Sequence, residues 1–498
     1  MLNPLKRYTS DRYAVIENGW LYTKDTKEPY KLDVLLSKRF KGYFIYTFDK
    51  AVFEAIKQRD LHLKLFQRNG HILGLKVELG NKHGSITFCD AANFFDDDDH
   101  PESLHEAIDY LHSLCAKSAI TPAGFALNLF RIKYQKKPLH STSIYAEKAI
   151  REAYAGGRTE ILQSELKEGF YFDVNSMYPS VMTEPMPCGF CIFTTERNKN
   201  RIGFYKVSVN QKYLKLPPLW KKINGALCFP ADEFIGWFSS AEIDNAIEAG
   251  AKIKIEYGYE FSEKRRIFKK MMTDLYKERL KGGYKKGLTK KILNSFYGKF
   301  GAKREINYIE RARTDAEYAD IVNNRKAKIF NENNLLYFKT KFLKQKYILP
   351  YLSAYIVSLG RVKLYKQATE IMNKGGKVAY MATDSLFTDT MIKTSDKLGG
   401  WGFEGVVKEA KFKALNTYKC ILNEKEIIKA GGINAEQSEL KKYMKGQTIA
   451  IKKKGAHTET LINQNVKLSN EFFKRNVQKH FSEPLSIGAI LSKMKLTG

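Results

Sequence analysis

The sequence predicts a multidomain protein of the α+β class. Its 498 residues are enough for about three domains of roughly 150 residues each. Segments of strand length alternate with helical segments in residues 1–115, and a further strand is predicted over 169–174. Two helices, over 264–280 and 285–300, follow each other around Gly282-Gly283, because adjacent glycines favour a turn. The first unit alone fits either an α/β or an α+β arrangement.

The remaining elements are predicted from local patterns. In the first unit, strands are expected over 42–47, 71–79 and 84–89, and a helix over 101–117. The run Asp96-Asp97-Asp98-Asp99 is interpreted as a solvated turn, since consecutive loop side chains rarely converge on one metal ion. Further along we expect a mixed region to about residue 259, a polar and basic stretch over 302–346, a helix over 349–373, a hairpin over 377–390 and a basic strand-plus-helix tail over 410–498.

The charge predicts a polyanionic partner. Lys and Arg number 84 and Asp and Glu number 54, so the net charge is +30, while 43% hydrophobic residues exclude a disordered polycation. Residues 261–300 carry a net +10 and residues 401–498 a net +9. Charge alone would suit a ribosomal protein, a nuclease, a polymerase or a membrane-surface protein, so the chemistry must come from motifs.

Targeting and cysteine signals favour a soluble, cytoplasmic protein. The N-terminus has no apolar signal region, and the most apolar stretch, residues 347–359, is interrupted by Pro350 and is too short to cross a bilayer. Six cysteines in so long a chain do not suggest a disulfide framework. The pair Cys188 and Cys191 is interpreted as buried thiols rather than as half of a zinc site, because no second ligand pair follows.

One helix carries an unusual row of polar side chains. Lys286, Lys290, Asn294 and Tyr297 fall on one face of the helix predicted over 285–300. A solvated face is the ordinary explanation. The row also leads into Gly298, where a ring beside a position without a side chain could form a flat pocket for a base, and lysines at successive turns suit the phosphates of a nucleotide.

Two aspartates are candidate metal ligands. Asp173 ends the apolar strand over 169–174, and Asp384 lies in the turn of the hairpin over 377–390. Either residue alone would more often be a cap or a turn residue. On neighbouring strands the pair could hold two Mg²⁺ ions roughly 3.5–4 Å apart, one activating an attacking hydroxyl and the other bridging a triphosphate.

These segments resemble family B DNA polymerases. The segment 173–180 (DVNSMYPS) resembles motif A, 290–298 (KKILNSFYG) resembles motif B, and 380–385 (YMATDS) resembles motif C. Tyr154-Ala155-Gly156-Gly157 resembles the Y-x-G-G element of the same family. The modest length and the basic stretch between motifs B and C point to the protein-primed subgroup of small linear-genome bacteriophages. The resemblance implies an RNase H-like exonuclease-type domain followed by a right-hand polymerase domain with an antiparallel palm sheet, helical fingers and a small thumb.

The resemblance also implies roles for individual residues. Asp173 and Asp384 would be the catalytic metal ligands, with the Val174 carbonyl, for two Mg²⁺ ions or for Mn²⁺ as a substitute. Tyr178 would pack under the sugar and exclude ribonucleotides. The nucleotide would also be bound by Ser176, Lys286, Lys290, Asn294, Tyr297 and one of Lys277 or Arg279. Contacts to DNA are implied for Tyr154, Gly156, Gly157, Gly298, Thr383, Thr417 and Tyr418.

Three departures from the family pattern stand out. Motif C has Ala382 where the family has its first Asp, which removes a carboxylate near the metals, and activity is still expected. Asn416-Thr417-Tyr418 resembles the K-x-Y element at the primer end but lacks its Lys. Asp49 and Asp109 match the second and third exonuclease motifs, whereas no D-x-E precedes them and the chain begins almost too late to hold that strand. An inactive or weak exonuclease-like domain that serves as a scaffold for the template is therefore expected.

The resemblance suggests the following division: 1–117 degenerate exonuclease-like domain, 118–168 connecting segment, 169–260 palm with insertion, 261–300 fingers, 301–346 insertion, 347–428 palm and 429–498 thumb. The 301–346 insertion either encircles the template during strand displacement or is a long surface loop. Expected partners are template and primer DNA, dNTPs and a terminal priming protein, with no membrane and a monomeric state. De novo initiation and a catalytically silent nucleic-acid-binding protein remain alternatives.

Overall fold

The computed structural model describes most of the chain up to residue 444 and two short strands beyond it. The described residues are 1–5, 12–59, 61–68, 71–79, 84–95, 100–302, 305–311, 329–331, 336–342, 346–431, 437–444, 451–452 and 472–473. No helix in these ranges is long and apolar enough to cross a membrane. The acidic run at 96–99 lies outside the described residues.

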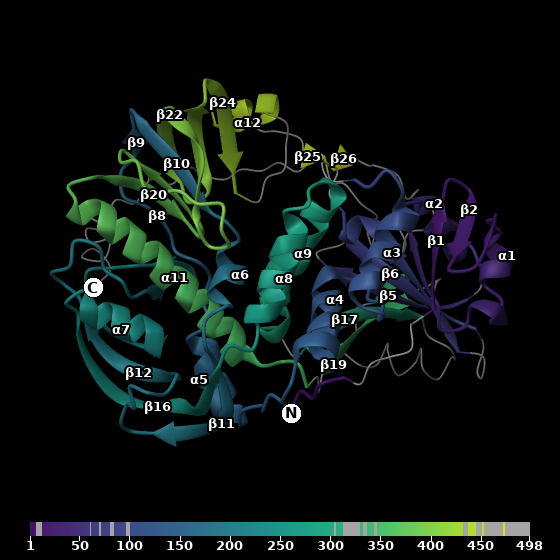
Figure 1. Cartoon of the computed structure of the whole chain (residues 1–498), viewed down its shortest axis with the longest axis horizontal. Coiled ribbons are helices and arrows are strands. Elements are labelled where there is room, and N and C mark those ends of the chain that lie inside the picture. Colours follow the sequence, from purple (N-terminus) through teal and green to yellow (C-terminus); the bar gives the residue numbers. More distant parts are fainter. Residues whose placement is uncertain are drawn as a thin grey trace.

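The N-terminal part is built on one mixed sheet, at the right of Figure 1. Its strands in spatial order are β18 (Ile329–Asn331), β19 (Leu336–Phe342), β17 (Glu305–Arg311), β5 (His62–Arg68), β6 (His71–Glu78), β7 (Ser85–Asp90), β4 (Phe44–Thr47), β1 (Tyr13–Glu17), β2 (Trp20–Thr23) and β3 (Lys27–Pro29). β1, β4 and β7 run parallel, while β2 and β3 complete an antiparallel meander beside β1. From the sequence, almost no room was expected for a strand before Asp49, and the structure places β1 there, paired with β4.

Alternation along these strands sends side chains to two separate cores. Ala14 and Ile16 of β1 face one side, where α1 (Leu32–Leu35) and α2 (Lys50–Lys57) cover the sheet. Val15 faces the other side, where α3 (Leu104–Leu114) packs. Short 3-10 turns at Lys38–Phe40 (η1) and Ala91–Asn93 (η2) follow α1 and β7.

The described part of the stretch 302–346 extends this sheet. β17 pairs with β5 through Ile309–Leu65 and Glu310–Lys64, and β19 pairs with β17 over its whole length. The two ends of the stretch meet where the Leu349 amide donates to the Phe300 carbonyl at 2.9 Å. The described part of this stretch is therefore not an irregular surface loop. That it encircles the template remains a prediction.

A second sheet forms the floor of the central region, at the upper left of Figure 1. Its main order is β24 (Lys425–Ala430), β23 (Thr417–Leu422), β22 (Trp401–Ala414), β10 (Gly169–Val174), β21 (Ser385–Thr388), β20 (Val378–Ala382) and β8 (Thr159–Ile161), with β9 (Glu165–Leu166) on β22. The strand predicted over 169–174 and the hairpin predicted around residue 384 are confirmed, and both lie at the centre.

The mixed region forms a separate four-stranded sheet. Its order is β11 (Met186–Thr194), β16 (Lys252–Arg265), β12 (Gly203–Asn210) and β15 (Glu233–Ser239), with α7 (Ser240–Glu248) on one face. β13 (Lys221–Ile223) and β14 (Ala226–Cys228) form a small hairpin. Because β16 pairs with β11 as far as Arg265, the helix predicted from residue 264 starts later, as α8 (Lys269–Arg279).

Long helices connect the sheets. α9 (Gly283–Phe300) packs against α8 and against α4 (Pro122–Leu129), where Phe130 and Phe296 have ring centroids 5.5 Å apart. α11 (Pro350–Asn373) contacts α5 (Ile144–Glu152), α6 (Met177–Val181), α7 and α9, and confirms the helix predicted over 349–373. A short π-helical turn over Phe130–Tyr134 (η4) follows α4. These contacts join the helices and the central sheet in one core.

The C-terminal tail is described only in part. α12 (Gln437–Met444) follows β24, and β25 (Ile451–Lys452) pairs with β26 (Phe472–Phe473). Most of the thumb predicted over 429–498 lies outside the described residues. All six cysteines are free. Cys188 is buried, as predicted, whereas Cys191 is only partly buried, and burial raises the pKa of these thiols to about 11 and about 12.

Candidate active site

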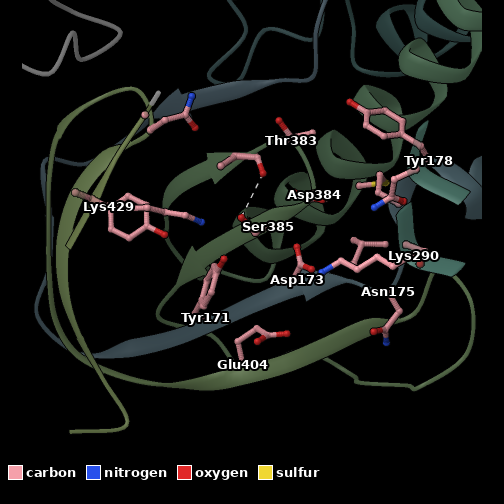
Figure 2. A pocket seen from close by; sticks show the side chains of 18 of the residues that line it. Tyr171, Asp173, Asn175, Tyr178, Lys290, Thr383, Asp384, Ser385, Glu404 and Lys429 are labelled. Carbon is pink, nitrogen blue, oxygen red and sulfur yellow. Dashed lines mark hydrogen bonds between the residues drawn. The ribbon is translucent and has the colours of Figure 1, made fainter. Parts of the chain in front are cut away.

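A cavity of about 1550 Å³ opens above the central sheet (Figure 2). It brings together most of the site residues predicted from the sequence: Asp173, Val174, Ser176, Tyr178, Arg279, Lys286, Lys290, Asn294, Tyr297, Thr383, Asp384 and Tyr418. These residues come from β10, from α6 and the turn before it, from α8 and α9, from the β20–β21 turn and from β23. Segments more than 240 positions apart in the sequence therefore meet at one place.

Strand pairing positions the two aspartates. β10 lies between β21 and β22, and Asp173 is paired with Ser385 on one side and with Gly402 on the other. The Val174 amide donates to the Asp384 carbonyl at 2.8 Å, which fixes the β20–β21 turn beside the end of β10. Thr383 has a φ of 58°, and its amide donates to the Arg158 carbonyl at 2.7 Å. The two carboxylates are therefore held by backbone contacts rather than by long flexible segments.

The aspartates form a destabilised acidic pair. Burial raises the pKa of Asp173 to about 7, and the nearby Asp384 and Glu404 carboxylates add to this effect. Burial also raises the pKa of Asp384, while Lys429 and Lys290 act in the opposite direction. Carboxylates crowded in this way favour a proton or a divalent cation, because both relieve the repulsion between like charges.

Glu404 is a cavity residue that the sequence analysis missed. The β10–β22 register shifts between Tyr171 and Phe172, so that Glu404 is the extra residue between Phe403 and Gly405. Such a β-bulge re-aims a side chain. The Asn423 side chain holds the bulge, since it donates to the Glu404 carbonyl at 3.1 Å and accepts from the Val406 amide at 2.9 Å. Figure 2 shows Glu404 beside Asp173 and Tyr171.

Cations of the two helices face the aspartates from one side. Lys286, Lys290, Asn294 and Tyr297 of α9 all line the cavity, so the predicted helical row does face one site. In Figure 2 the Lys290 side chain extends toward Asp173. Of the two alternatives on the preceding helix, Arg279 lines the cavity and its guanidinium contacts the Ser176 hydroxyl, whereas Lys277 is exposed and is not part of the lining.

Tyr178 lies where α6, α9 and α11 meet. Its ring centroid is 4.5 Å from that of Tyr297, and burial raises its pKa to about 12. A Cβ added to Gly360 of α11 would lie 3.2 Å from the Tyr178 ring, so this glycine gives the ring its space. The phenol is therefore a rigid, neutral wall of the cavity.

The segment 154–158 lines a smaller, neighbouring cavity. Tyr154, Gly156 and Gly157 border about 450 Å³ that also touches Tyr178 and Tyr297. A Cβ on Gly157 would lie 2.7 Å from the Thr383 side chain, so glycine is needed for this approach to motif C. Arg361 of α11 donates to the Ala155 and Gly156 carbonyls at 3.1 and 2.6 Å, which fixes the segment.

Not all of the remaining residues line the large cavity. Thr417 is buried at the start of β23, and a Cβ added to Gly298 would meet no atom within 4 Å; neither residue lines the cavity. The departures Ala382 and Asn416 do line it. So does Lys429, the first residue of the segment predicted as the thumb, to which no role was assigned from the sequence.

Asp49 and Asp109 are engaged within the N-terminal part. Asp49 caps α2, where its side chain accepts from the Ala51 amide at 2.8 Å. Asp109 accepts from the Tyr13 hydroxyl at 2.6 Å, and the Tyr13 ring stacks on His112 with centroids 3.7 Å apart. Glu17, at the end of β1, accepts from the Leu104 amide at 2.6 Å at the start of α3.

Comparisons with known proteins agree with this geometry. Residues 102–373, more than half of the chain, match the family model described as DNA polymerase type B, organellar and viral. A probable DNA polymerase of Podospora anserina is 29% identical over 62% of this chain and 29% of its own length, and the DNA polymerase of Bacillus phage B103 is 25% identical over 66% and 60%. The chain thus spans less than two thirds of these curated relatives.

A solved structure shares the fold. The phi29 DNA polymerase complexed with primer-template DNA and incoming nucleotide superimposes with a TM-score of 0.66 at 17% identity, over 90% of this chain and 96% of that one. The predicted fold class, an exonuclease-type domain followed by a right-hand domain, is confirmed by this match.

Proposed function

The chain belongs to the organellar and viral family of type B DNA polymerases, and from this premise we propose that it is a DNA-directed DNA polymerase. The observation that carries the proposal is the cavity in which Asp173 and Asp384 face the cations of α8 and α9. The proposed reaction is attack by a primer 3′-hydroxyl on the α-phosphate of a dNTP, which breaks the α–β phosphoanhydride bond and releases pyrophosphate.

The donor set of the cavity fits divalent cations. Asp173 and Asp384 offer hard oxygen ligands, and a cation would relieve the repulsion between them. Val174, the residue after Asp173, also lines the cavity and would offer its carbonyl. Among the described residues, no group of three or more His, Cys, Asp or Glu side chains is placed to hold a metal alone. The pair of carboxylates supports Mg²⁺, or Mn²⁺ as a substitute, since Mg²⁺ commonly uses one or two carboxylates together with substrate phosphates. Two such ions would lower the pKa of the attacking hydroxyl and neutralise the leaving group.

The protein side chains bind and orient the substrates. Lys290, Lys286 and Arg279 neutralise the triphosphate, and the Arg279 guanidinium keeps donors for it beside its contact with the Ser176 hydroxyl. The Tyr178 and Tyr297 rings form the wall against which the sugar and base pack. A 2′-hydroxyl would meet the Tyr178 ring, which neither the packed Tyr297 nor the close Gly360 allows to move away.

The experiment is primer extension by the purified chain, with Mg²⁺ and with Mn²⁺, each of the four dNTPs being offered singly. The proposal expects incorporation of the nucleotide complementary to the template in at least one metal. Ala382 favours the alternative of a silent nucleic-acid-binding protein. Retained binding of primer-template without incorporation in either metal would establish that alternative and defeat the polymerase proposal.

Protein priming and strand displacement are the finer parts of this proposal. The similarity to phage polymerases supports them, as does the strand pairing of the 301–346 insertion with the N-terminal sheet. The proposed partners are template and primer DNA, dNTPs and a terminal protein, with the chain acting as a monomer. Products that stay covalently attached to a protein after denaturation would support priming by a terminal protein, whereas unattached products with a 5′-triphosphate would show de novo initiation.

We also propose that the N-terminal domain has no exonuclease activity or only a weak one, and that it serves as a scaffold for the template. The strand β1 carries Val15 and Ile16 before Glu17 instead of D-x-E, and Glu17 and Asp109 are engaged in internal hydrogen bonds. A labelled single strand should therefore stay intact with Mg²⁺. Degradation that disappears in Asp49→Ala would overturn this proposal.

A further inference from the structure

Cations line the active-site cavity on two opposite sides. Arg279, Lys286 and Lys290 come from the helices α8 and α9. Among the described residues, Lys429 is the one Lys or Arg that lines the cavity from the β22–β24 side. Figure 2 shows Lys429 and Lys290 extending inward from opposite sides of Asp173. The acidic pair thus lies between two cationic regions of different origin.

Strand pairing aims Lys429 into the cavity. Lys429 is paired with Tyr418 across β23 and β24, and its Nζ lies 5.9 Å from the centroid of the Tyr418 ring. Its neighbours Ile428 and Ala430 are buried, so Lys429 is on the open face of the sheet. It forms no ion pair with the described carboxylates, yet it lies near enough to Asp173 and Asp384 to lower the pKa of both. Its charge is therefore available to a ligand.

The neighbouring turn explains why this cation comes from β24. Asn416 has a φ of 59°, a left-handed conformation that asparagine tolerates better than most residues. Its amide donates to the Tyr380 hydroxyl at 2.8 Å, and a Cβ on Gly431 would lie 2.8 Å from the Asn416 Cβ. Asparagine is thus well suited to this left-handed turn, and it brings no charge to the cavity.

We propose that Lys429 binds the 3′-terminal phosphodiester of the primer strand. The inference rests on the proposed function. In nucleotidyl transfer the incoming triphosphate and the primer end approach the acidic pair from different sides. The cations of α8 and α9 serve the triphosphate. Among the described residues that line the cavity, Lys429 is then the remaining cation, and we assign it to the primer. Lys429 thereby supplies, from the adjacent strand, the charge that Asn416 does not carry.

The test is a binding cycle that combines a protein variant with a modified primer. Primer-template affinity is measured by fluorescence anisotropy in EDTA without dNTP, for the full chain, Lys429→Ala, Lys429→Arg and the control Lys425→Ala. Lys425 is an exposed lysine of the same strand that does not line the cavity. Each protein is tested with an ordinary primer and with one whose last linkage is a neutral methylphosphonate.

We expect Lys429→Ala to weaken binding of the ordinary primer about tenfold, the scale of one charge-assisted contact, and to have less than a twofold effect on the methylphosphonate primer. Lys429→Arg should stay within about threefold of the parent, and Lys425→Ala should affect both primers equally. Equal losses on the two primers, or no loss on either, would overturn the proposal.

Kinetics separate this inference from the proposed function. At saturating primer-template, Lys429→Ala should leave the KM for dNTP within about twofold, whereas Lys286→Ala should raise it. A raised KM for dNTP in Lys429→Ala would instead assign this lysine to the triphosphate and overturn the proposal. The binding cycle needs neither metal nor turnover, so it is decided even if the chain proves unable to polymerise, which would refute only the proposed function.

Discussion

Replacing Arg361 by methionine should destabilise the protein strongly, because it would leave a buried carboxylate without its partner. Arg361 and Glu242 are each 3% exposed, and their closest N–O distance is 2.8 Å. The same guanidinium donates to the Ala155 and Gly156 carbonyls, so it joins α11 to α7 and to the segment that touches motif C. The Trp220 indole also donates to Glu242, at 3.0 Å.

The magnitude follows from burial. Removing one partner of a buried ion pair costs about 3–5 kcal/mol, whereas an exposed pair contributes about 0–1 kcal/mol. Lys374→Met provides the matched control, since Lys374 pairs with Glu370 at 2.6 Å near the end of the same helix with side chains 68% and 54% exposed. The double variant Arg361→Met/Glu242→Met should recover part of the loss, because no unpaired charge remains.

The assay is urea-induced unfolding followed by tryptophan fluorescence, with all variants under the same conditions. We expect a clearly lower midpoint for Arg361→Met, a midpoint near that of the parent for Lys374→Met, and an intermediate one for the double variant. If Arg361→Met and Lys374→Met unfold at the same midpoint, the reasoning about this buried pair is refuted.

Two further predictions concern the active site. Because the Asp173 pKa is raised to about 7, protons should compete with the metal below that pH, and the Mg²⁺ concentration for half-maximal incorporation should rise by up to about tenfold per pH unit. Glu404→Gln should lower the pKa of Asp173, so the Mg²⁺ concentration for half-maximal incorporation should begin to rise only at a lower pH. A Mg²⁺ requirement that stays flat between about pH 6 and pH 8 would contradict the role of Asp173 as a metal ligand. Tyr178→Val should open space beside the sugar and increase the efficiency of ribonucleotide relative to deoxynucleotide incorporation by about 10–200-fold. An unchanged ratio in single-nucleotide kinetics would show that this ring does not select the sugar.

Several site residues could be predicted from local sequence patterns. Asp173 ends an apolar strand, Asp384 lies in a hairpin turn, and Lys286 and Lys290 recur with helical spacing, so each position could be assigned from local pattern. Their meeting in one cavity depends on the pairing of β10 with β21, which no local pattern gives, and it was expected only because the resemblance assigned both aspartates to one metal site.

Residues placed by irregular or long-range pairing could not be found in this way. Glu404 reaches the cavity through a β-bulge that no periodicity predicts, and Lys429 through pairing with Tyr418 across a turn. The helix predicted from residue 264 begins later because pairing with β11 keeps Lys264 and Arg265 in a strand. The choice between Lys277 and Arg279 depends on the rotation of α8 relative to the cavity, which is set by packing.

The most direct test of the central claim is single-nucleotide incorporation by Asp173→Asn and Asp384→Asn, with the affinity for primer-template measured on the same preparations. Asp389→Asn, at the far end of β21 and outside the cavity lining, serves as the control. We expect both cavity variants to lose at least about a thousandfold in rate, the scale on which single groups that stabilise developing charge act in other enzymes. Their affinity for DNA and the activity of Asp389→Asn should stay near those of the parent. Incorporation at the parent rate by either cavity variant would contradict the central claim.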